Sequence, residues 1–424
     1  MARAHSSKRP RMAPQHYLSA PPRKMWPWRL GAAIVGVVLF LGTGAGLAFH
    51  DLQGSVNISN ADALLERKPV DSYEGRALNI LVLGTDTRKG EGNAIDQTDD
   101  ETDRSDTTMI AHISRDRKHV NVVSLARDTM VNIPSCPLGN GKHTQAQRGQ
   151  FNWAFAYGGS AGNRDAAIAC TIMTVEKMTG LHIDDYVLVD FNGFRSMVDA
   201  LGGIRVYVDS PINDWHVDLD IDAGCYTMDG QMALKYARVR HGVKGGDGSD
   251  TQRMKRQQHV VSVMVREALS KNLLTSVPEL YKFARAGLSS LTTSSSLSNL
   301  STLTGLAYSL QGIDPHKMLF LSAPIGQDPA DLNRVVLDER APALWQALKN
   351  DRDLPAGLDV KDLAGNEFTT SGPDSTAEAK ETTRAPESAS HDSQAPSHST
   401  PTPSATAPSV DPVEKARLEC EPKG

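Results

Sequence analysis

A run of twenty residues without a charged side chain, at positions 30–49, constrains this chain more than any other feature. A helix of that length crosses the ~30 Å hydrocarbon core of a bilayer. Trp26 and Trp28 stand just before the run, and amphipathic rings favour the membrane interface. The sequence therefore predicts one transmembrane helix over residues 30–49.

The charges that flank this run predict its orientation. Residues 1–29 contain seven lysines and arginines and no acidic residue, and basic flanks stay in the cytoplasm. A cleaved signal peptide is the alternative, but its apolar core is usually ~7–15 residues long, so a retained anchor is favoured. We expect a single-pass protein of the cell membrane, with a cytoplasmic N-terminus and an extracellular C-terminal domain.

Composition divides the 424 residues into five parts. The last part is rich in Ser, Thr, Ala and Pro, and such a sequence buries too little apolar surface to offset its chain entropy. The predicted parts are a basic cytoplasmic arm (1–29), the transmembrane helix (30–49), an extracellular stalk (50–75), a folded domain (76–354) and a disordered tail (355–424).

Periodicity within residues 76–354 indicates an α/β domain. Residues 109–113 and 119–125 flank a polar turn and predict an antiparallel hairpin. Strands alternating with helices are typical of layered α/β domains, and the hairpin makes the predicted sheet mixed. Further strands are predicted at 78–83, 186–190, 204–208 and 318–321, and helices at 162–179, 192–201, 229–237, 251–270, 277–288, 296–310 and 341–349.

The four cysteines all fall on the predicted outside of the membrane, where disulfides persist. We predict that Cys136 pairs with Cys170, because both belong to the folded domain. Cys420 follows the predicted tail, so its partner stays open. Cys225 is equally well explained as a small buried side chain.

Arginine and aspartate side chains gather at the predicted ends of strands and beside a glycine-rich loop. Such strand ends are where the ligand sites of α/β sheets usually lie. Asp250, Arg253 and Gln257 share one face of a predicted helix, because they are three and four residues apart. The full set comprises Asp86, Arg104, Asp106, Arg127, Asp128, Arg238, Arg240, Asp250, Arg253 and Gln257.

These residue types predict a pyrophosphate site. Guanidinium groups bind phosphate oxygens through paired hydrogen bonds. Converging arginines repel one another unless a highly charged anion neutralises them, and a pyrophosphate carries enough charge. Carboxylates beside it suit Mg²⁺, which commonly takes one or two carboxylates together with substrate phosphates. Surface ion pairs explain any single arginine, but they do not explain five arginines at the ends of buried elements.

Eight segments of the chain together resemble the LytR-CpsA-Psr (LCP) family, in the family's order and roughly its spacing. The resemblance covers about residues 76–350, and its specificity lies in the whole set of segments. They are NILVLGTDTR from position 79, RSDT from 104, SLARDT from 124, NWAFAYGG from 152, VDFNGF from 189, VDALGG from 198, LKYARVR from 234 and RMKRQQ from 253.

That resemblance implies a three-layer α-β-α sandwich with a mixed central sheet and a long apolar pocket for a polyprenyl chain. It implies transfer of a glycopolymer from its undecaprenyl-pyrophosphate carrier to peptidoglycan, with a phosphodiester link as product and Mg²⁺ or Mn²⁺ as the divalent ion. Apolar faces that suit the pocket, or equally well ordinary core packing, are Val261, Met264 and Val265, and Leu303, Leu306 and Leu310.

The resemblance also implies roles for the matched residues. Asp86 and Asp106 are the expected metal ligands. The attacking group is expected to be a sugar hydroxyl of peptidoglycan. Its general base would be a carboxylate that the sequence does not identify: Asp128 and Asp250 are candidates, but an aspartate beside an arginine more often forms an orienting ion pair. The expected pyrophosphate-binding residues are Arg104, Arg127, Arg238, Arg240, Arg253 and Gln257, and the same arginines with Asp250 form the expected catalytic set.

Two other classes of function compete with this one. A non-catalytic polyprenyl-phosphate-binding regulator or cell-wall-binding protein would keep the arginines and the pocket but show no turnover. A serine hydrolase is suggested only by residues 158–162, which fit G-x-S-x-G around Ser160 but lack a convincing preceding strand. A nucleic-acid partner is not expected, because the net charge is −5 and the pI is about 6.2.

Overall fold

The computed structural model describes residues 57–67, 73–85, 104–246, 248–270, 277–310, 313–372 and 412–421. The predicted transmembrane segment at 30–49 and the predicted metal ligand Asp86 lie outside these ranges. Within the ranges, no helix has both the length and the apolar character that a membrane span requires.

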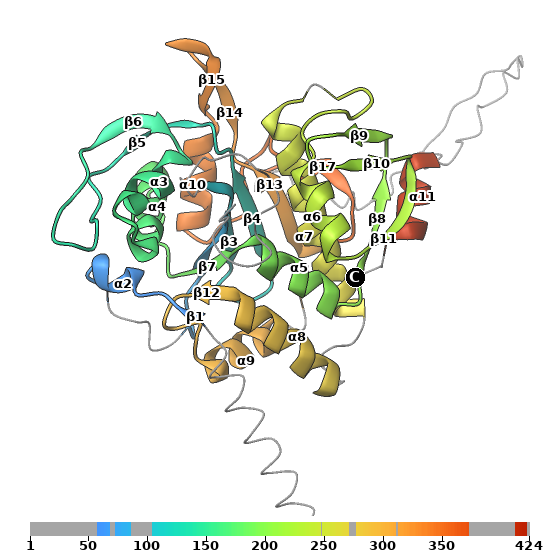
Figure 1. Cartoon of the computed structure of the whole chain (residues 1–424), viewed down its shortest axis with the longest axis horizontal. Helices are drawn as coiled ribbons and strands as arrows, with labels where there is room; N and C mark the ends of the chain where they lie inside the picture. The colour runs from blue at the N-terminus through green and yellow to red at the C-terminus, as the bar shows by residue number, and fades with distance from the viewer. Residues whose placement is uncertain are drawn as a thin grey trace, which may run out of the picture. The chain divides into compact units, whose positions relative to one another are not determined.

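A mixed sheet forms the centre of the domain (Figure 1). In spatial order, its described strands are β1 (Asn57–Ile58), β12 (Leu291–Thr293), β7 (Asp185–Val189), β2 (Leu78–Thr85), β3 (Ser105–Ile113), β4 (Val120–Leu125), β13 (Met318–Ser322), β16 (Asp359–Asp362) and β17 (Glu367–Thr369). β2 pairs with β7 and β4 with β13 in parallel, whereas β3 is antiparallel to both β2 and β4. The predicted mixed α/β fold is confirmed.

The hairpin of β3 and β4 is the element that the sequence predicts most directly. Ile113 pairs with Val120 across a polar turn, and Ser114 N donates a hydrogen bond to His119 O at 3.0 Å. At the other end of the hairpin, Thr108 lies opposite Leu125. The start of β3 and the end of β4 therefore share one edge of the sheet.

One face of the sheet is buried against the helices α3 (Trp153–Gly158), α4 (Arg164–Thr179) and α10 (Ala341–Lys349). Alternate strand residues point to this face, because strand side chains alternate between the two faces. Leu81, Leu83 and Ile110 are fully buried there, together with Ile168 of α4 and Leu344 of α10.

The opposite face packs against α7 (Asp250–Ser270) and residues of and next to α9 (Leu300–Ser309). Met109 and Val122 are buried in this second cluster. Val261 and Val265 of α7 and Leu306 of α9 are only partly buried against it. Helices therefore cover both faces, and the second face retains accessible apolar side chains.

A further core lies between α5 (Phe191–Ala200), α6 (Gly230–Arg238) and a pair of strands, β8 (Ile204–Val208) and β11 (Gly224–Met228). The strand predicted at 204–208 thus pairs outside the central sheet. Both helices begin at aspartate caps, since Asp190 Oδ1 accepts from Gly193 N and Asp229 Oδ1 from Met232 N. Val260 and Val263 of α7 pack into this core, so α7 contacts two cores.

The fold begins earlier than the predicted boundary at 76. We predicted a stalk over 50–75, but β1 pairs with β12, and Ala61 in α2 (Ala61–Leu64) is fully buried. Arg67 forms an ion pair with Glu176 of α4. These partners are distant in the chain, so local composition does not show them.

The other described strands and α-helices are β5 (Met130–Ile133), β6 (Gln147–Gln150), β9 (Ile212–Asp214), β10 (Leu219–Ile221), α8 (Val277–Ser290), β14 (Ile325–Asp328) and β15 (Asp331–Leu337).

The fold also continues beyond the predicted boundary at 354. We predicted a disordered tail from 355, but β16, β17 and α11 (Pro412–Cys420) fall within it. Leu358, Val360 and Leu363 are buried, which explains why the first part of the predicted tail is folded. The prediction of disorder over 355–424 is therefore wrong for residues 355–372 and 412–421.

Both pairs of cysteines form disulfides. The bond between Cys136 and Cys170 confirms the predicted pairing and joins the segment after β5 to α4. The second bond joins Cys420 of α11 to Cys225 of β11, across a sequence separation of 195 residues. Composition does not reveal a bond to so distant a residue, which is why α11 was not expected.

Candidate active site

The ends of three central strands bring together residues that are far apart in the sequence. Thr85, the last residue of β2, pairs with Ser105 of β3. Because β3 begins where β4 ends, Asp106 and Arg127 lie at the same edge of the sheet. Asp250, the first residue of α7, contacts Arg127 there. The charged residues thus meet at strand ends, as the sequence pattern predicts.

Two arginines and two aspartates form an ion cluster at this edge, which we call the arginine–aspartate cluster (Asp106, Arg127, Asp250 and Arg253). Arg127 Nη1 donates to Asp106 Oδ1 at 2.6 Å, and Arg127 Nε lies 3.3 Å from Asp250 Oδ1. Arg253 Nη2 lies 2.6 Å from the same oxygen of Asp250. The side chains of Arg253 and Asp250 are only 8% and 13% exposed, so these charges meet away from bulk water.

Asp250 lacks hydrogen bonds despite its two cationic neighbours. Both of its carboxylate oxygens are buried, and neither accepts a well-oriented hydrogen bond from a described residue. Burial raises the pKa of Asp250 above its ordinary value, and this effect outweighs the attraction of Arg253 and Arg127. Such buried, unsatisfied groups are costly, and they are expected where a ligand completes the hydrogen bonding.

The two guanidinium groups of the cluster differ in their electrostatics. Burial alone would lower the pKa of Arg127, but Asp106, Asp250 and Asp128 hold this pKa above its ordinary value. Burial lowers the pKa of Arg253 despite Asp250, and the neighbouring charges of Arg127 and Arg240 lower it further. An added anion would therefore stabilise the charged form of Arg253 more than that of Arg127.

Arg238 is the last residue of α6, and Arg240 follows two residues later and acts electrostatically on Asp250 and Arg253. The guanidinium of Arg238 stacks over the Phe191 ring, 4.8 Å from its centroid, and a cation–π contact of this kind orients the arginine. Arg240 Nε donates to Gly248 O at 3.4 Å. Arg240, His241 and Gly248 line a concavity of about 250 Å³, so this loop also presents open space beside its arginine.

Asp214 positions the Arg240 loop and was not predicted from the sequence. Its buried Oδ2 accepts from Arg240 N at 3.0 Å and from His241 N at 2.9 Å. Burial alone would raise the pKa of Asp214, but hydrogen bonds from His241, Arg240 and His216 hold it below its ordinary value. Gly242, which follows His241 in the same loop, has φ of +68°. A Cβ at this position would collide with Asn213 O. Only tertiary contacts identify these residues.

Arg104, Gln257 and Asp128 are the other described residues of the predicted set. Arg104 immediately precedes β3 and is half-buried. Gln257 lies about one turn after Arg253 on α7 and is also half-buried, with no hydrogen bond to a described residue. Asp128 Oδ1 accepts from Gln150 Nε2 at 3.2 Å, and its other oxygen lies 3.8 Å from Arg127 Nε.

The metal prediction is only partly covered by the described residues. They contain no group of three or more His, Cys, Asp or Glu side chains arranged to hold an ion. Asp106 is described, whereas Asp86 is not. Thr85 of β2 pairs with Ser105, the residue before Asp106. Two carboxylates are enough for Mg²⁺ when substrate phosphates complete its coordination.

Ser160 does not have the geometry of a nucleophile elbow. The helix α3, rather than a strand, precedes it, and the motif requires a strand-to-helix turn. The Ser160 side chain is exposed, and its Oγ donates to Tyr157 O at 2.8 Å. The structure therefore gives no support to a serine hydrolase.

Comparison with known proteins identifies relatives over most of the domain. The polyisoprenyl-teichoic acid–peptidoglycan teichoic acid transferase TagU of Enterococcus faecalis is 31% identical over 258 residues, which cover 59% of this chain and 75% of that protein. The transferase of that description from Bacillus subtilis, TagT, is 28% identical over 271 residues, covering 60% of this chain and 74% of TagT.

Solved structures and the family model agree with this relationship. The crystal structure of protein gbs0355 from Streptococcus agalactiae shares the fold, with a TM-score of 0.51 and 21% identity over 70% of this chain and 92% of that one. The LytR_cpsA_psr family model matches residues 49–350, and this chain therefore belongs to the LytR-CpsA-Psr family.

Proposed function

We propose that this chain is a membrane-anchored extracellular phosphotransferase. It moves a glycopolymer from an undecaprenyl-pyrophosphate carrier to peptidoglycan and forms a phosphodiester link. The names of the relatives TagU and TagT support transfer of a polyisoprenyl-linked polymer to peptidoglycan. The observation that carries the proposal is the buried Asp250, held between Arg127 and Arg253 without a hydrogen bond to either oxygen.

The two positive and two negative charges of this cluster cancel, so a pyrophosphate bound there also needs the neighbouring arginines. The pyrophosphate oxygens would accept hydrogen bonds from the buried Nε atoms of Arg127 and Arg253, which make no hydrogen bond to a described residue. Arg104, Arg238 and Arg240 add further positive charge around the same edge. When the bond to the sugar-bearing phosphorus breaks, these arginines stabilise the departing undecaprenyl phosphate. One such donor typically contributes roughly 10²–10³ in rate.

Asp86 and Asp106 would hold a divalent cation, Mg²⁺ or Mn²⁺. The bound ion would supply positive charge to the pyrophosphate oxygens. Asp106 supports this role because Arg127 engages only one of its oxygens, and its side chain stays 29% exposed at the strand edge.

The attacking sugar hydroxyl needs a proton acceptor, and Asp250 suits this task better than Asp128. One oxygen of Asp128 already accepts a hydrogen bond from Gln150, whereas neither oxygen of Asp250 does so from a described residue. The raised pKa of Asp250 also makes it a stronger base than an ordinary aspartate, which favours general base catalysis. We therefore propose Asp250 as the general base.

The prenyl chain of the carrier needs an apolar site, and the second face of the sheet offers one. Val261, Val265, Leu306 and Leu310 remain partly buried against the cluster of Met109 and its neighbours. Met264 contacts the core around α5 and α6 instead, so it is not part of the proposed site. A transmembrane anchor at 30–49 would tether the domain to the bilayer and raise the local concentration of carrier lipid.

Transfer in a reconstituted membrane tests the proposal. The full chain in phospholipid nanodiscs is mixed with an undecaprenyl-pyrophosphate-linked N-acetylglucosamine disaccharide, peptidoglycan and Mg²⁺. We expect mass spectrometry to detect a phosphodiester-linked product, lost with EDTA and in Arg127→Ala. Arg115→Ala is the matched control, because this exposed arginine lies in the hairpin turn. Arg127-independent binding of the lipid without transfer to any peptidoglycan preparation would instead establish the non-catalytic regulator.

A further inference from the structure

A second cavity lies on the far side of α7 from the arginine–aspartate cluster. Its volume is about 740 Å³, and α7 lines it with Thr251, Lys255 and Ser262. These residues are roughly opposite Asp250 and Arg253, because each helical residue turns by about 100°. Residues of β13, β16, β17 and α11 also line the cavity, and the last three of these elements lie beyond the 49–350 match to the family model. The C-terminal segment therefore contributes one part of the wall, and α7 and β13 contribute much of the rest.

Basic side chains outnumber acidic ones around this cavity, which we call the cationic cavity. The basic residues are Lys255, Arg256, Arg340, Lys361 and Arg417, whereas only three lining residues are acidic. An excess of one sign of charge around a cavity favours ligands of the opposite sign. The cationic cavity therefore attracts anions.

Lys361 and Arg417 approach the same carboxylate oxygen. Lys361 Nζ lies 3.4 Å and Arg417 Nη1 3.7 Å from Glu367 Oε1. The two basic side chains are 20% and 11% exposed, whereas Glu367 is 68% exposed. Burial and the charge of Arg417 lower the pKa of Lys361. Arg417 Nη2 also donates to Gly365 O at 2.9 Å, so the solvated Glu367 is one carboxylate that both largely buried cations approach.

Arg256 brings a third cation from α7. Its Nη2 donates to Val239 O at 2.7 Å, but its buried Nε makes no hydrogen bond to a described residue. Burial lowers its pKa below the ordinary value. A bound anion would offset the cost of burying this guanidinium group.

We propose that the cationic cavity binds an acidic saccharide, whose carboxylate or phosphate group lies between Lys361, Arg417 and Arg256. The rim suits a sugar, since Phe368 lines the cavity and is 45% exposed. Its ring offers an apolar surface to the face of a pyranose, while Thr251 and Gln252 offer hydrogen-bonding groups.

The identity of the ligand class rests on the proposed transfer reaction, because both of its substrates are saccharides that carry anionic groups. The donor polymer can carry phosphate or uronate groups, and the acceptor carries peptide carboxylates. α7 presents the arginine–aspartate cluster on one face and the cationic cavity on the other. A saccharide in the cavity is therefore held about one helix diameter, ~10 Å, from the proposed reaction centre.

Binding of three defined probes to the full chain in nanodiscs tests this site. The probes are a disaccharide–tripeptide fragment of peptidoglycan, a glycerol-phosphate oligomer and neutral chitotetraose. We expect at least one anionic probe to bind, with an affinity that falls as salt rises, and chitotetraose to bind far more weakly. The fragment tests the acceptor as the source of the anion, and the oligomer tests the donor.

Three variants attribute that binding to the cavity. The double variant Lys361→Gln, Arg417→Gln should lower the affinity for the anionic probe about tenfold or more, since two charge-assisted contacts are lost. Lys415→Gln is the matched control, because this lysine lies on α11 with its side chain 72% exposed. Glu367→Gln should tighten binding severalfold, since it removes the competing carboxylate, and a misfolded protein would not show that gain.

Two results would overturn the site: equal binding of chitotetraose and the anionic probes, or unchanged affinity in the double variant. Arg127→Ala separates this proposal from the proposed function. It should abolish transfer and leave probe binding intact. Loss of probe binding in Arg127→Ala would place the anion in the arginine–aspartate cluster and contradict the cationic cavity.

Discussion

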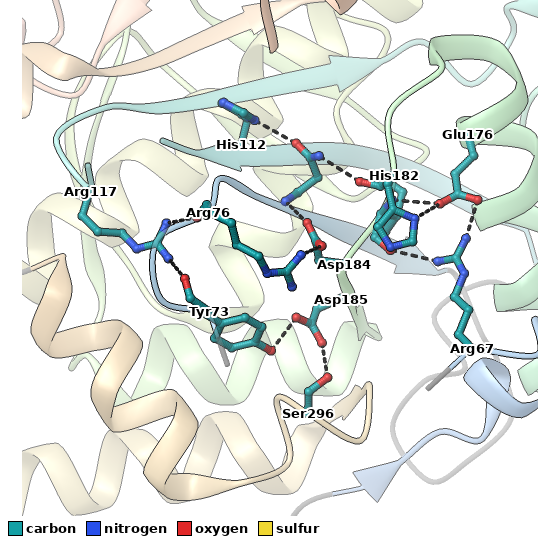
Figure 2. A network of polar contacts seen from close by, with 12 residues as sticks. Arg67, Tyr73, Arg76, His112, Arg117, Glu176, His182, Asp184, Asp185 and Ser296 are labelled. Carbon is teal, nitrogen blue, oxygen red and sulfur yellow. Dashed lines mark hydrogen bonds and ion pairs between the residues drawn. The ribbon is translucent and has the colours of Figure 1, made fainter. Parts of the chain in front are cut away.

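Charged residues gather at both ends of the central sheet, but the two groups are satisfied in different ways. The polar network of Figure 2 lies at the end where β2 and β7 begin. There, Asp184 accepts from Arg76 Nη1 at 2.6 Å and from Asn79 N at 2.8 Å. Asp185 accepts from Tyr73 Oη, Ser294 Oγ and Ser296 Oγ. In the arginine–aspartate cluster at the other end, Asp250 accepts no hydrogen bond from a described residue.

The same contrast appears in the pKa values of two carboxylates. Burial alone would raise the pKa of Glu176 in the polar network, but His182, Ile183 N and Arg67 hold it below its ordinary value. Burial also acts on Asp250, and there it prevails and raises the pKa. Two guanidinium groups near a carboxylate thus lower its pKa less effectively than directed hydrogen bonds do. A satisfied network stabilises the fold, whereas an unsatisfied one is expected where a ligand binds.

The isosteric change Asp250→Asn should separate activity from stability most strongly. Transfer should fall by roughly 10²–10³, as for the loss of one preorganised catalytic group. The melting temperature should stay nearly the same, because the gain from removing a carboxylate whose ionised form burial disfavours offsets the loss of a counter-charge for Arg253. Calorimetry and the nanodisc transfer assay measure the two effects. A clear fall in melting temperature would mean that Asp250 is a structural ion-pair residue like those in Figure 2.

A third carboxylate, Glu421, extends the comparison because it is both deeply buried and fully satisfied. It accepts from His259 Nε2 and Arg266 Nη2 of α7 and from Tyr207 N. Burial opposes ionisation, but His259, Arg266 and the Tyr207 N–H hold the pKa of Glu421 at about 2, below its ordinary value of 4.5. The ionised group should therefore stabilise the fold by ~3 kcal/mol.

The sign of this pKa shift sets the pH window. The stabilisation from Glu421 is present above about pH 4.5 and is lost as the pH falls from there toward 2. Denaturant unfolding across that range measures it. Glu421→Gln should flatten this part of the stability profile and lower stability at neutral pH, because it leaves Arg266 buried without its counter-charge. A profile identical to that of the unaltered protein would contradict the buried ion pair.

Asp185→Asn is the matched change at the satisfied end of the sheet. The amide cannot accept all three hydroxyl hydrogen bonds, so stability should fall by ~1–3 kcal/mol. The transfer rate of the folded protein should not change, since β7 separates Asp185 from the strand ends that carry the arginines. A large loss of turnover with normal stability would mean that the two ends of the sheet are coupled.

Local sequence patterns predict the elements that make local contacts. The apolar periodicity predicts α4, α6, α7 and α10 to within about two residues of their observed bounds. The helix predicted from 296 begins instead at Leu300. The reason is that Ser294 and Ser296 donate to Asp185, and serine side chains that bond elsewhere compete with helix formation.

The candidate site shows the same division between local and tertiary information. Arg127 and Arg253 are predictable, because strand ends and helix spacing place them together. Asp214 is not predictable, since it is a single aspartate in a short strand and acts through the Arg240 loop. The folding of α11 is likewise hidden, because its disulfide partner Cys225 belongs to a distant strand. Contacts that close long loops leave no periodic signal in the sequence.

The smallest predicted effect concerns Phe191, whose ring faces the Arg238 guanidinium at 4.8 Å. Phe191→Leu keeps an apolar side chain at the start of α5 but removes the aromatic face. The lost cation–π contact that orients Arg238 should cost ~0.5–1 kcal/mol of interaction free energy. If Arg238 binds the pyrophosphate, the loss should appear as a two- to fivefold weaker affinity for the lipid carrier, since 1.4 kcal/mol is about tenfold. Phe194→Leu in the same helix is the control, because Phe194 packs against the neighbouring core. Equal affinities of the two variants would show that Arg238 needs no aromatic support, and would restrict the ligand-dependent region to the arginine–aspartate cluster.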